Sequence, residues 1–146
     1  MKIASELIKI KYHPKAKFKL EKKDVGDWID LYCLEDVVLK AGERAYIHQG
    51  VAMKLPEGYE AIMAPRSSTF KRWGVLQSNG IGVIDNSYCG NDDYWMFPAY
   101  ATRDIAIPAG TRICQFRIQP VQPEILFEEV INLQTESRGG LGSTGV

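Results

Sequence analysis

Short strand-like runs separated by glycine and proline turns fill most of this sequence. Residues 8–12 (Ile-Lys-Ile-Lys-Tyr) alternate apolar and basic side chains, which is typical of a strand with one face on a core. Turn signals separate the later runs, as at residues 41–43, 56–58, 79–80 and 108–110. The further predicted strands are 37–40, 44–49, 51–55, 59–64, 75–77, 94–101, 105–107, 112–119 and 125–131. This pattern favours an all-β fold, a compact barrel or jelly roll.

One short helix and a glycine-rich tail complete the predicted organisation. Residues 68–73 are expected to form the helix, with Ser67 or Ser68 capping its start and Gly74 ending it. From residue 136 the chain reads Glu-Ser-Arg-Gly-Gly-Leu-Gly-Ser-Thr-Gly-Val, which is too rich in glycine to order by itself. We expect a single domain over 1–146 whose tail, 136–146, is mobile until something binds it.

The charge balance and the residue counts exclude several functional classes. Eighteen basic and eighteen acidic residues cancel, which argues against broad, salt-driven binding to nucleic acid. No apolar run approaches the ~20 residues that span a bilayer, and the N-terminus has no signal-peptide core, so a cytoplasmic location without membrane contact is expected. Cys33, Cys89 and Cys114 are too few and too scattered for a disulfide framework or a CxxC zinc site. Both histidines lie away from the motifs described below.

The segment from residue 82 to 90, Gly-Val-Ile-Asp-Asn-Ser-Tyr-Cys-Gly, is the strongest candidate for catalysis. Asp85 follows a glycine-flanked apolar run, and Tyr88 comes three residues later in a turn. A carboxylate held in this way can activate a water molecule, while the nearby phenol ring lies flat against a bound sugar.

Two segments are suited to phosphate. Arg66, Ser67 and Ser68 lie where a strand gives way to a helix, and the tail from Arg138 to Gly145 offers glycine N–H groups and two hydroxyls. An ordinary serine cap beside a surface arginine, and a flexible C-terminus, are the plain alternatives. Gln115 should point away from the core face of its strand, towards a ligand or towards solvent, and Asp30 is equally ambiguous taken alone.

Taken in order, these segments resemble the five sequence motifs of the trimeric dUTPases. The motifs correspond to residues 26–33, 65–68, 79–90, 110–115 and 139–145, so the resemblance spans nearly the whole chain. Residues 91–100 (Asn-Asp-Asp-Tyr-Trp-Met-Phe-Pro-Ala-Tyr) further resemble dUTPases of Gram-positive bacteria and their phages.

The resemblance implies a β-jelly-roll homotrimer that hydrolyses dUTP to dUMP and pyrophosphate at sites shared among three subunits. This reaction keeps uracil out of DNA and supplies dUMP for dTMP synthesis. Asp85 would activate the water that attacks the α-phosphorus, and Asp30 would reach Mg²⁺ through water. The glycine-rich tail would close over the ligand. The implied substrate-binding residues are Arg66, Ser67, Ser68, Asn79, Gly82, Val83, Ile84, Tyr88, Gln115, Arg138, Gly140, Leu141, Gly142, Ser143 and Thr144.

Among these, Asn79 would hydrogen-bond the uracil edge, and Tyr88 would pack under deoxyribose. A tight hairpin over residues 79–84 would leave no space for the methyl group of thymine. Arg66, Ser67, Ser68 and Gln115 would hold the phosphates.

The last motif departs from the family pattern. Leu141 stands where the family has a phenylalanine that stacks on uracil, and Glu136 stands where an arginine is expected. Arg138 is near but in another register. The stacking lid is therefore expected from Tyr94, Trp95 or Met96, and the sequence does not decide among them. In the third motif, Ile81 replaces the usual proline and Val83 the usual threonine.

Three other interpretations compete with the dUTPase resemblance. A dCTP deaminase shares this fold, but it needs a glutamate where this chain has Trp95. A phage-type regulator would use the same scaffold to bind a repressor protein, with or without hydrolysis. A purely structural jelly roll gives no reason for the spacing of Asn79, Asp85, Tyr88 and Gln115.

Overall fold

The computed structural model describes residues 4–142 and shows a β-rich body with one short helix and a long C-terminal arm. The expected all-β class is confirmed. The body contains these elements: β1 (Lys9–Tyr12), β2 (Ile29–Tyr32), β3 (Val37–Leu39), β4 (Arg44–His48), β5 (Val51–Lys54), β6 (Tyr59–Pro65), α1 (Thr69–Trp73), β7 (Val75–Gln77), β8 (Gly82–Ile84), β9 (Met96–Ala101), β10 (Ile105–Ile107) and β11 (Arg112–Pro120).

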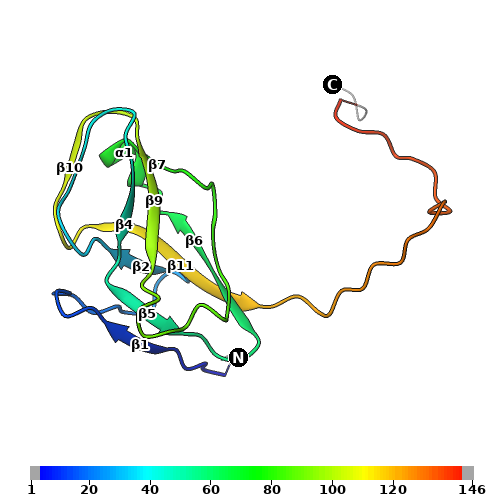
Figure 1. Cartoon of the computed structure of the whole chain (residues 1–146), viewed down its shortest axis with the longest axis horizontal. Helices are drawn as coiled ribbons and strands as arrows, with labels where there is room; N and C mark the ends of the chain where they lie inside the picture. The colour runs from blue at the N-terminus through cyan, green and yellow to red at the C-terminus, as the bar shows by residue number, and fades with distance from the viewer. Residues whose placement is uncertain (1–3, 143–146) are drawn as a thin grey trace.

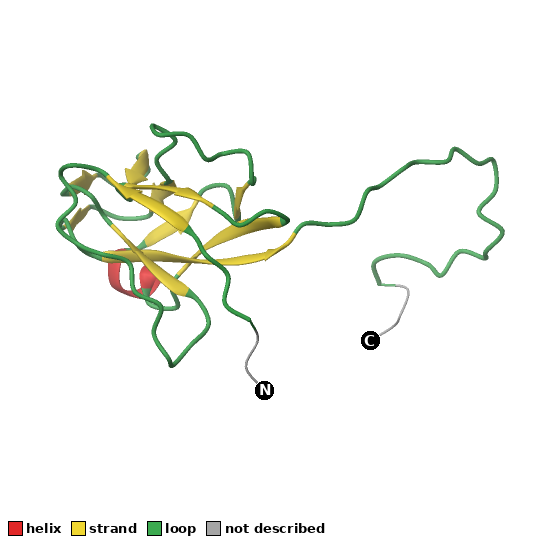
Figure 2. Cartoon of the chain, turned by 90° about the horizontal axis from the view of Figure 1, so that it is seen from below, coloured by secondary structure: helices red, strands yellow, loops and turns green. Residues whose placement is uncertain are grey.

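Four antiparallel sheets enclose one core. Their strand orders are β2-β11-β6-β8, β4-β9-β7, β1-β5 and β10-β3. Neighbours in each sheet are mostly distant in sequence, which is the pattern of a jelly roll rather than of simple hairpins. The largest fully buried side chains include Trp95, Phe97, Phe116, Leu31 and Ile47. Figures 1 and 2 show the strands wrapped around this core, with α1 at one end of the body.

The predicted helix forms, but its start is not capped as expected. Ser68 occupies the cap position in a right-handed helical conformation and makes no capping hydrogen bond. The Thr69 hydroxyl instead accepts a hydrogen bond from the Arg66 N–H and donates one to the Ile113 carbonyl. Gly74 ends the helix in the left-handed region, at φ 66°, as predicted.

Three differences from the predicted strands follow from pairing. β2 and β8 were not predicted as strands. Residues 125–131 were predicted to form a strand, and they do not; among residues 4–142 no strand pairs with them. From residue 121 the chain leaves the body as an arm without helix or strand among its described residues (Figures 1 and 2).

The three cysteines are free thiols, as expected. Burial raises the pKa of Cys33 to about 12, and burial raises the pKa of Cys114 as well, so both stay protonated at neutral pH. Cys89 is exposed. Over residues 4–142 there is no helix long and apolar enough to cross a bilayer.

Candidate active site

A cavity of about 400 Å³ beside β8 gathers most residues predicted for the nucleoside end of the substrate. Asp85 and Tyr88 both line it, which brings the predicted catalytic carboxylate and the predicted sugar platform together. The complete lining is Tyr46, Val83, Ile84, Asp85, Ser87, Tyr88, Tyr94, Trp95, Met96 and Pro98. We call this the nucleoside cavity.

Strand β8 is held tightly against β6 by a glycine. Gly82 is buried opposite Met63, and a Cβ at Gly82 would lie 2.9 Å from the Met63 Cβ. This distance is shorter than a normal contact between two carbon atoms, so only glycine allows the strands to approach this closely. Val83 is exposed on the outer side of β8, where it lines the nucleoside cavity.

An asparagine that the sequence reading left without a role anchors the loop after β8. The Asn86 side-chain amide donates to the Pro56 carbonyl at 2.9 Å and to the Tyr59 carbonyl at 2.8 Å. These bonds tie the residue after Asp85 to the turn that begins β6. The Asp-Asn pair in a glycine-bounded turn was the only available sequence signal, because asparagine commonly bonds backbone groups in such places.

The Asp85 carboxylate is exposed and ionised. It accepts hydrogen bonds from the Ser87 hydroxyl and from the Ser87 N–H, the latter at 2.9 Å. These bonds, the hydroxyl's first, lower the pKa of Asp85 below its ordinary value. One carboxylate oxygen is thereby fixed, and the other is left to accept a hydrogen bond from a water molecule.

Tyr88 and Tyr94 form one wall of the cavity. The Tyr88 hydroxyl donates to the Tyr94 carbonyl at 3.0 Å. Burial and the nearby charge of Asp93 raise the pKa of Tyr88, so its phenol stays neutral at physiological pH. The Tyr94 ring is braced from outside by the His13 ring, at 5.3 Å between centroids, and by the Lys11 ammonium, 5.5 Å from the Tyr94 centroid.

Trp95 is removed from the set of possible lids. Its side chain is only 1% exposed and packs edge-on against Phe116, with ring centroids 5.0 Å apart. A residue so deep in the core cannot swing over a base without opening that core. Tyr94 and Met96 stay candidates, because both line the cavity and neither is buried.

The predicted phosphate ligands lie elsewhere on the chain, around a second cavity of about 350 Å³. We call it the arginine pocket, and its lining is Arg66, Ser68, Arg72, Trp73, Pro108, Thr111 and Arg112. Asp30 fixes two of these guanidinium groups: its carboxylate lies 2.9 Å from Arg66 Nε and 4.0 Å from Arg112 Nε. The ion pairs hold Arg66 in place before any ligand arrives.

Gln115 and Ser67 lie near the arginine pocket but do not line it. The Gln115 amide donates to the Pro65 carbonyl at 3.1 Å, and Gln115 pairs across the sheet with Asp30. Ser67, next to Arg66, is exposed. Ser67 therefore adjoins Arg66 in sequence, and Gln115 contacts Pro65, the residue before Arg66.

The structure thus divides the predicted site residues into groups. The nucleoside cavity and the arginine pocket share no lining residue. Asn79 is exposed in the turn between β7 and β8 and lines neither. Arg138, Gly140, Leu141 and Gly142 are exposed on the arm, whereas Ser143 and Thr144 lie outside the described residues.

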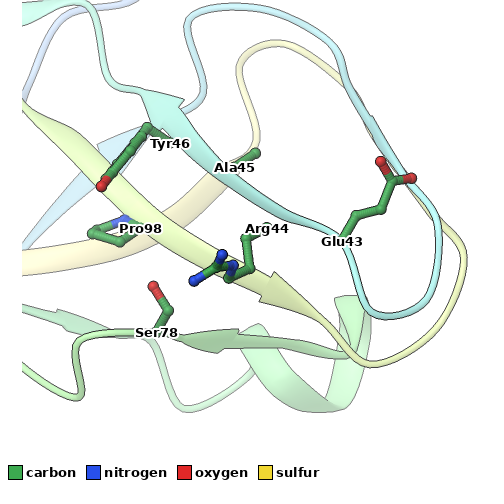
Figure 3. A pocket seen from close by; sticks show the side chains of 6 residues that line it. All are labelled: Glu43, Arg44, Ala45, Tyr46, Ser78 and Pro98. Carbon is green, nitrogen blue, oxygen red and sulfur yellow. The ribbon is translucent and has the colours of Figure 1, made fainter.

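A third cavity, of about 470 Å³, adjoins the nucleoside cavity and shares Tyr46 and Pro98 with it. Figure 3 shows Arg44, Tyr46, Ser78 and Pro98 around this recess, with Glu43 directed away from the others. The Ser78 N–H donates to the Pro98 carbonyl at 3.0 Å, and both residues line the recess. Asn79 is the next residue after Ser78. Tyr46 and Ser78 were not predicted as site residues, because Tyr46 belongs to no recognisable motif and Ser78 lies just before the motif at 79–90.

The residues present suit a metal ion that binds mainly to the phosphates of the substrate. Within residues 4–142 no three His, Cys, Asp or Glu side chains gather into a metal cage. Mg²⁺ commonly keeps several waters and binds through substrate phosphates with one or two carboxylates. Asp30 is the carboxylate beside the arginine pocket. Although it holds two arginines, a carboxylate has about four lone-pair sites and can still accept a hydrogen bond from a metal-bound water.

Comparison with protein families gives a match to the dUTPase family model over residues 19–145. The chain is 54% identical to the SPbeta prophage-derived deoxyuridine 5′-triphosphate nucleotidohydrolase YosS of Bacillus subtilis (strain 168), over 94% of this chain and 97% of that protein. It is 40% identical to the deoxyuridine 5′-triphosphate nucleotidohydrolase of Cutibacterium acnes, over 80% of this chain and 78% of that protein.

Solved structures share the fold. A Staphylococcus bacteriophage 80alpha dUTPase variant with dUpNHpp matches with a TM-score of 0.79 at 22% identity, over 97% of this chain and all of that one. A dUTPase variant from phage phi11 of S. aureus, described with a structural Mg(II) ion, matches with a TM-score of 0.73 at 19% identity, over 88% of this chain and 99% of that one.

Proposed function

This chain belongs to the dUTPase family and is an enzyme that hydrolyses dUTP, and from that premise we propose how its own residues carry out the reaction. Water attacks the α-phosphorus, and dUMP and pyrophosphate leave. The observation that carries this proposal is the placement of an ionised Asp85 beside Tyr88 in the nucleoside cavity.

Asp85 positions the attacking water. Its lowered pKa makes it a weak base, so proton removal contributes less than orientation does. Ser87 fixes one oxygen of the carboxylate, and Asn86 fixes the adjoining backbone. A water molecule that donates a hydrogen bond to the free Asp85 oxygen is held in position for attack, and such positioning can lower the activation barrier substantially.

The nucleoside cavity selects deoxyuridine. The Tyr88 ring packs under deoxyribose and leaves no room for a ribose 2′-hydroxyl. Asn79, which follows Ser78 of the adjoining recess, and the backbone of β8, at Gly82 to Ile84, meet the uracil edge. A hydrogen-bond mismatch then rejects cytosine, and lack of space rejects the thymine methyl. Tyr94 is the stronger candidate for the lid, because its aromatic ring offers a stacking face that Met96 lacks.

The arginine pocket receives the phosphates. Arg66 offers a guanidinium fork already aligned by Asp30, and Ser67, Ser68 and Gln115 add polar groups beside it. Mg²⁺ bound to the phosphates would neutralise charge that builds up on them and favour nucleophilic attack. Asp30 would hold that ion through a water molecule.

The separation of the two cavities supports a homotrimer with shared sites. A dUTP molecule needs a nucleoside cavity and an arginine pocket at once, and these lie on different parts of one chain. In a trimer, the nucleoside cavity of one subunit would face the arginine pocket of the next. The arm of a third subunit, with Arg138, Gly140, Leu141, Gly142, Ser143 and Thr144, would close over both.

Pyrophosphate release tests the enzyme proposal. Wild-type protein with Mg²⁺ should release pyrophosphate from dUTP and not from dTTP, dCTP or UTP. Asp85→Asn should keep the fold and the trimer but lose the reaction. Release from all four nucleotides, or full activity in Asp85→Asn, would contradict the assigned site.

A second function as a protein-binding regulator is suggested by one comparison. A Staphylococcus bacteriophage 80alpha dUTPase structure is described in terms of phage dUTPases that control transfer of virulence genes by a G protein-like mechanism. For this chain, a repressor-type partner would be captured from host lysate in a nucleotide-dependent manner. Equal capture with and without dUTP would contradict nucleotide control, and the absence of any captured repressor would contradict the partner itself.

A further inference from the structure

We propose that Arg72 is an additional substrate-binding residue, which contacts the pyrophosphate portion of dUTP beside Arg66. This inference rests on the proposed function and assigns a residue that the family motifs leave out. It explains how the chain balances the charge of a triphosphate although its arm is poor in cations.

The arm does not supply the positive charge that a bound triphosphate needs. From residue 121 to 146 its charged residues are Arg138 and four glutamates at positions 124, 128, 129 and 136. Within the glycine-rich end at 136–146, Glu136 and Arg138 cancel, and the other three glutamates precede it, so the arm brings no net positive charge to a bound polyphosphate. The compensating positive charge must therefore come from the body of the protein.

The arginine pocket is the place in the body where that charge gathers. Three of its seven lining residues are arginines, and none of the seven is acidic. Asp30 approaches Arg66 and Arg112, so its carboxylate is shared by two guanidinium groups. In the described part of the chain Arg72 has no carboxylate partner within 4.0 Å, which leaves its charge available to an anion.

Arg72 is also placed to meet the same ligand as Ser68 and Arg66. It lies four residues after Ser68, so both side chains are on one face of the helical turn, and the Arg72 N–H donates to the Ser68 carbonyl at 2.9 Å. The Arg72 guanidinium lies 5.3 Å from the Trp73 ring centroid. This contact restrains the side chain without neutralising it.

The size of the pocket fits the pyrophosphate portion. About 350 Å³ is open among Arg66, Arg72 and Arg112. Phosphate oxygens gathered there can accept from two guanidinium forks at once, which is the geometry that arginine favours. Lys71 serves as a matched control, because it belongs to the same helix, is exposed, and does not line the pocket.

Binding of a non-hydrolysable imido analogue of dUTP, compared with binding of dUMP, tests the assignment. Arg72→Ala should weaken the triphosphate analogue about tenfold, the effect expected for losing one charge-assisted hydrogen bond, and should change dUMP affinity less than about twofold. KM for dUTP should rise by a similar factor with kcat little changed, because the contact forms in the bound substrate as well as in the transition state. Lys71→Ala should match wild type in both assays.

The outcomes separate this proposal from the one on which it rests. If wild type does not hydrolyse dUTP, the proposed function fails. If wild type is active and Arg72→Ala binds the analogue as tightly as Lys71→Ala does, the Arg72 assignment fails. Should Arg72→Ala unfold, Arg72→Gln keeps most of the side chain over Trp73 without the charge, and unchanged affinity in that variant would overturn the assignment. Arg72→Lys should restore part of the lost affinity.

Discussion

The anchoring of the loop after β8 by Asn86 leads to a prediction about stability and catalysis together. The Asn86 amide donates two hydrogen bonds, to the Pro56 and Tyr59 carbonyls. A net value of about 0.5–1.5 kcal/mol for each bond gives a loss of about 1–3 kcal/mol in the free energy of unfolding for Asn86→Ala. Asn86→Asp should be at least as damaging, because its carboxylate would face two carbonyl oxygens with no proton to donate.

Catalysis should suffer more than stability in this variant. Asn86 adjoins Asp85, so a loosened loop lets the carboxylate and its water drift. A displacement of about 1 Å can cost about 100-fold in rate, and we expect kcat for dUTP to fall by about 10- to 100-fold. Asn86 does not line the arginine pocket, so phosphate binding should be retained.

Urea unfolding at matched protein concentration and steady-state kinetics would check both parts. The matched control is Asn91→Ala, which removes the same amide from an exposed position in the following loop. Asn91→Ala should stay within about 0.5 kcal/mol of wild type. If Asn86→Ala had wild-type stability and wild-type kcat, the anchor would have no role, and the placement of Asp85 would need another cause.

The remaining predictions concern the nucleoside cavity and the strand β8 beside it. Ser87→Ala removes a hydrogen bond that lowers the pKa of Asp85, so the acid limb of the pH profile of kcat/KM should move to higher pH, as a pH titration would show. Gly82→Ala should lower the free energy of unfolding in urea by about 1–3 kcal/mol, because the added methyl group would overpack against β6. Tyr94→Ala should raise KM for dUTP and lower the melting temperature only slightly, through the lost contacts with His13 and Lys11, whereas Trp95→Ala should destabilise the fold by about 3–5 kcal/mol through a core cavity.

The sequence predicted most of the strands because their alternation and their turns are local properties. β7 and β10 match the predicted bounds, and the other predicted strands that form differ only at their ends. β8 was not predicted because its three residues, one of them glycine, are too few to show an alternation of apolar and polar side chains. It is a strand only because Gly82 lets it lie against β6. The run at 125–131 shows the opposite case, since its composition suits a strand but no strand in the described part of the chain pairs with it.

The lid candidates show what a sequence pattern can decide. Side chains along β9 alternate, so Phe97, Ala99 and Ala101 are buried while Met96 and Tyr100 face outward. Extending that parity by one residue puts Trp95 on the buried side and Tyr94 on the outer side. The alternation was readable in the sequence and would have excluded Trp95. Which face of β9 points towards the core, however, depends on its pairing with β4 and β7, which only the structure reveals.

The arm links the fold to the proposed assembly. Its apolar side chains, Leu126, Phe127, Ile131 and Leu133 among them, are almost fully exposed in the single chain. Burying such side chains gains about 1.5–3 kcal/mol each, so an arm that stayed in water would forgo a large stabilisation. The body has completed its own core without them, and the arm runs away from it.

The same arm ends in the residues expected to close the active site. Docking on a neighbouring subunit would therefore bury its apolar residues and bring its glycine-rich end to the substrate in a single step. In this arrangement the association of subunits and the completion of the active site depend on the same contacts.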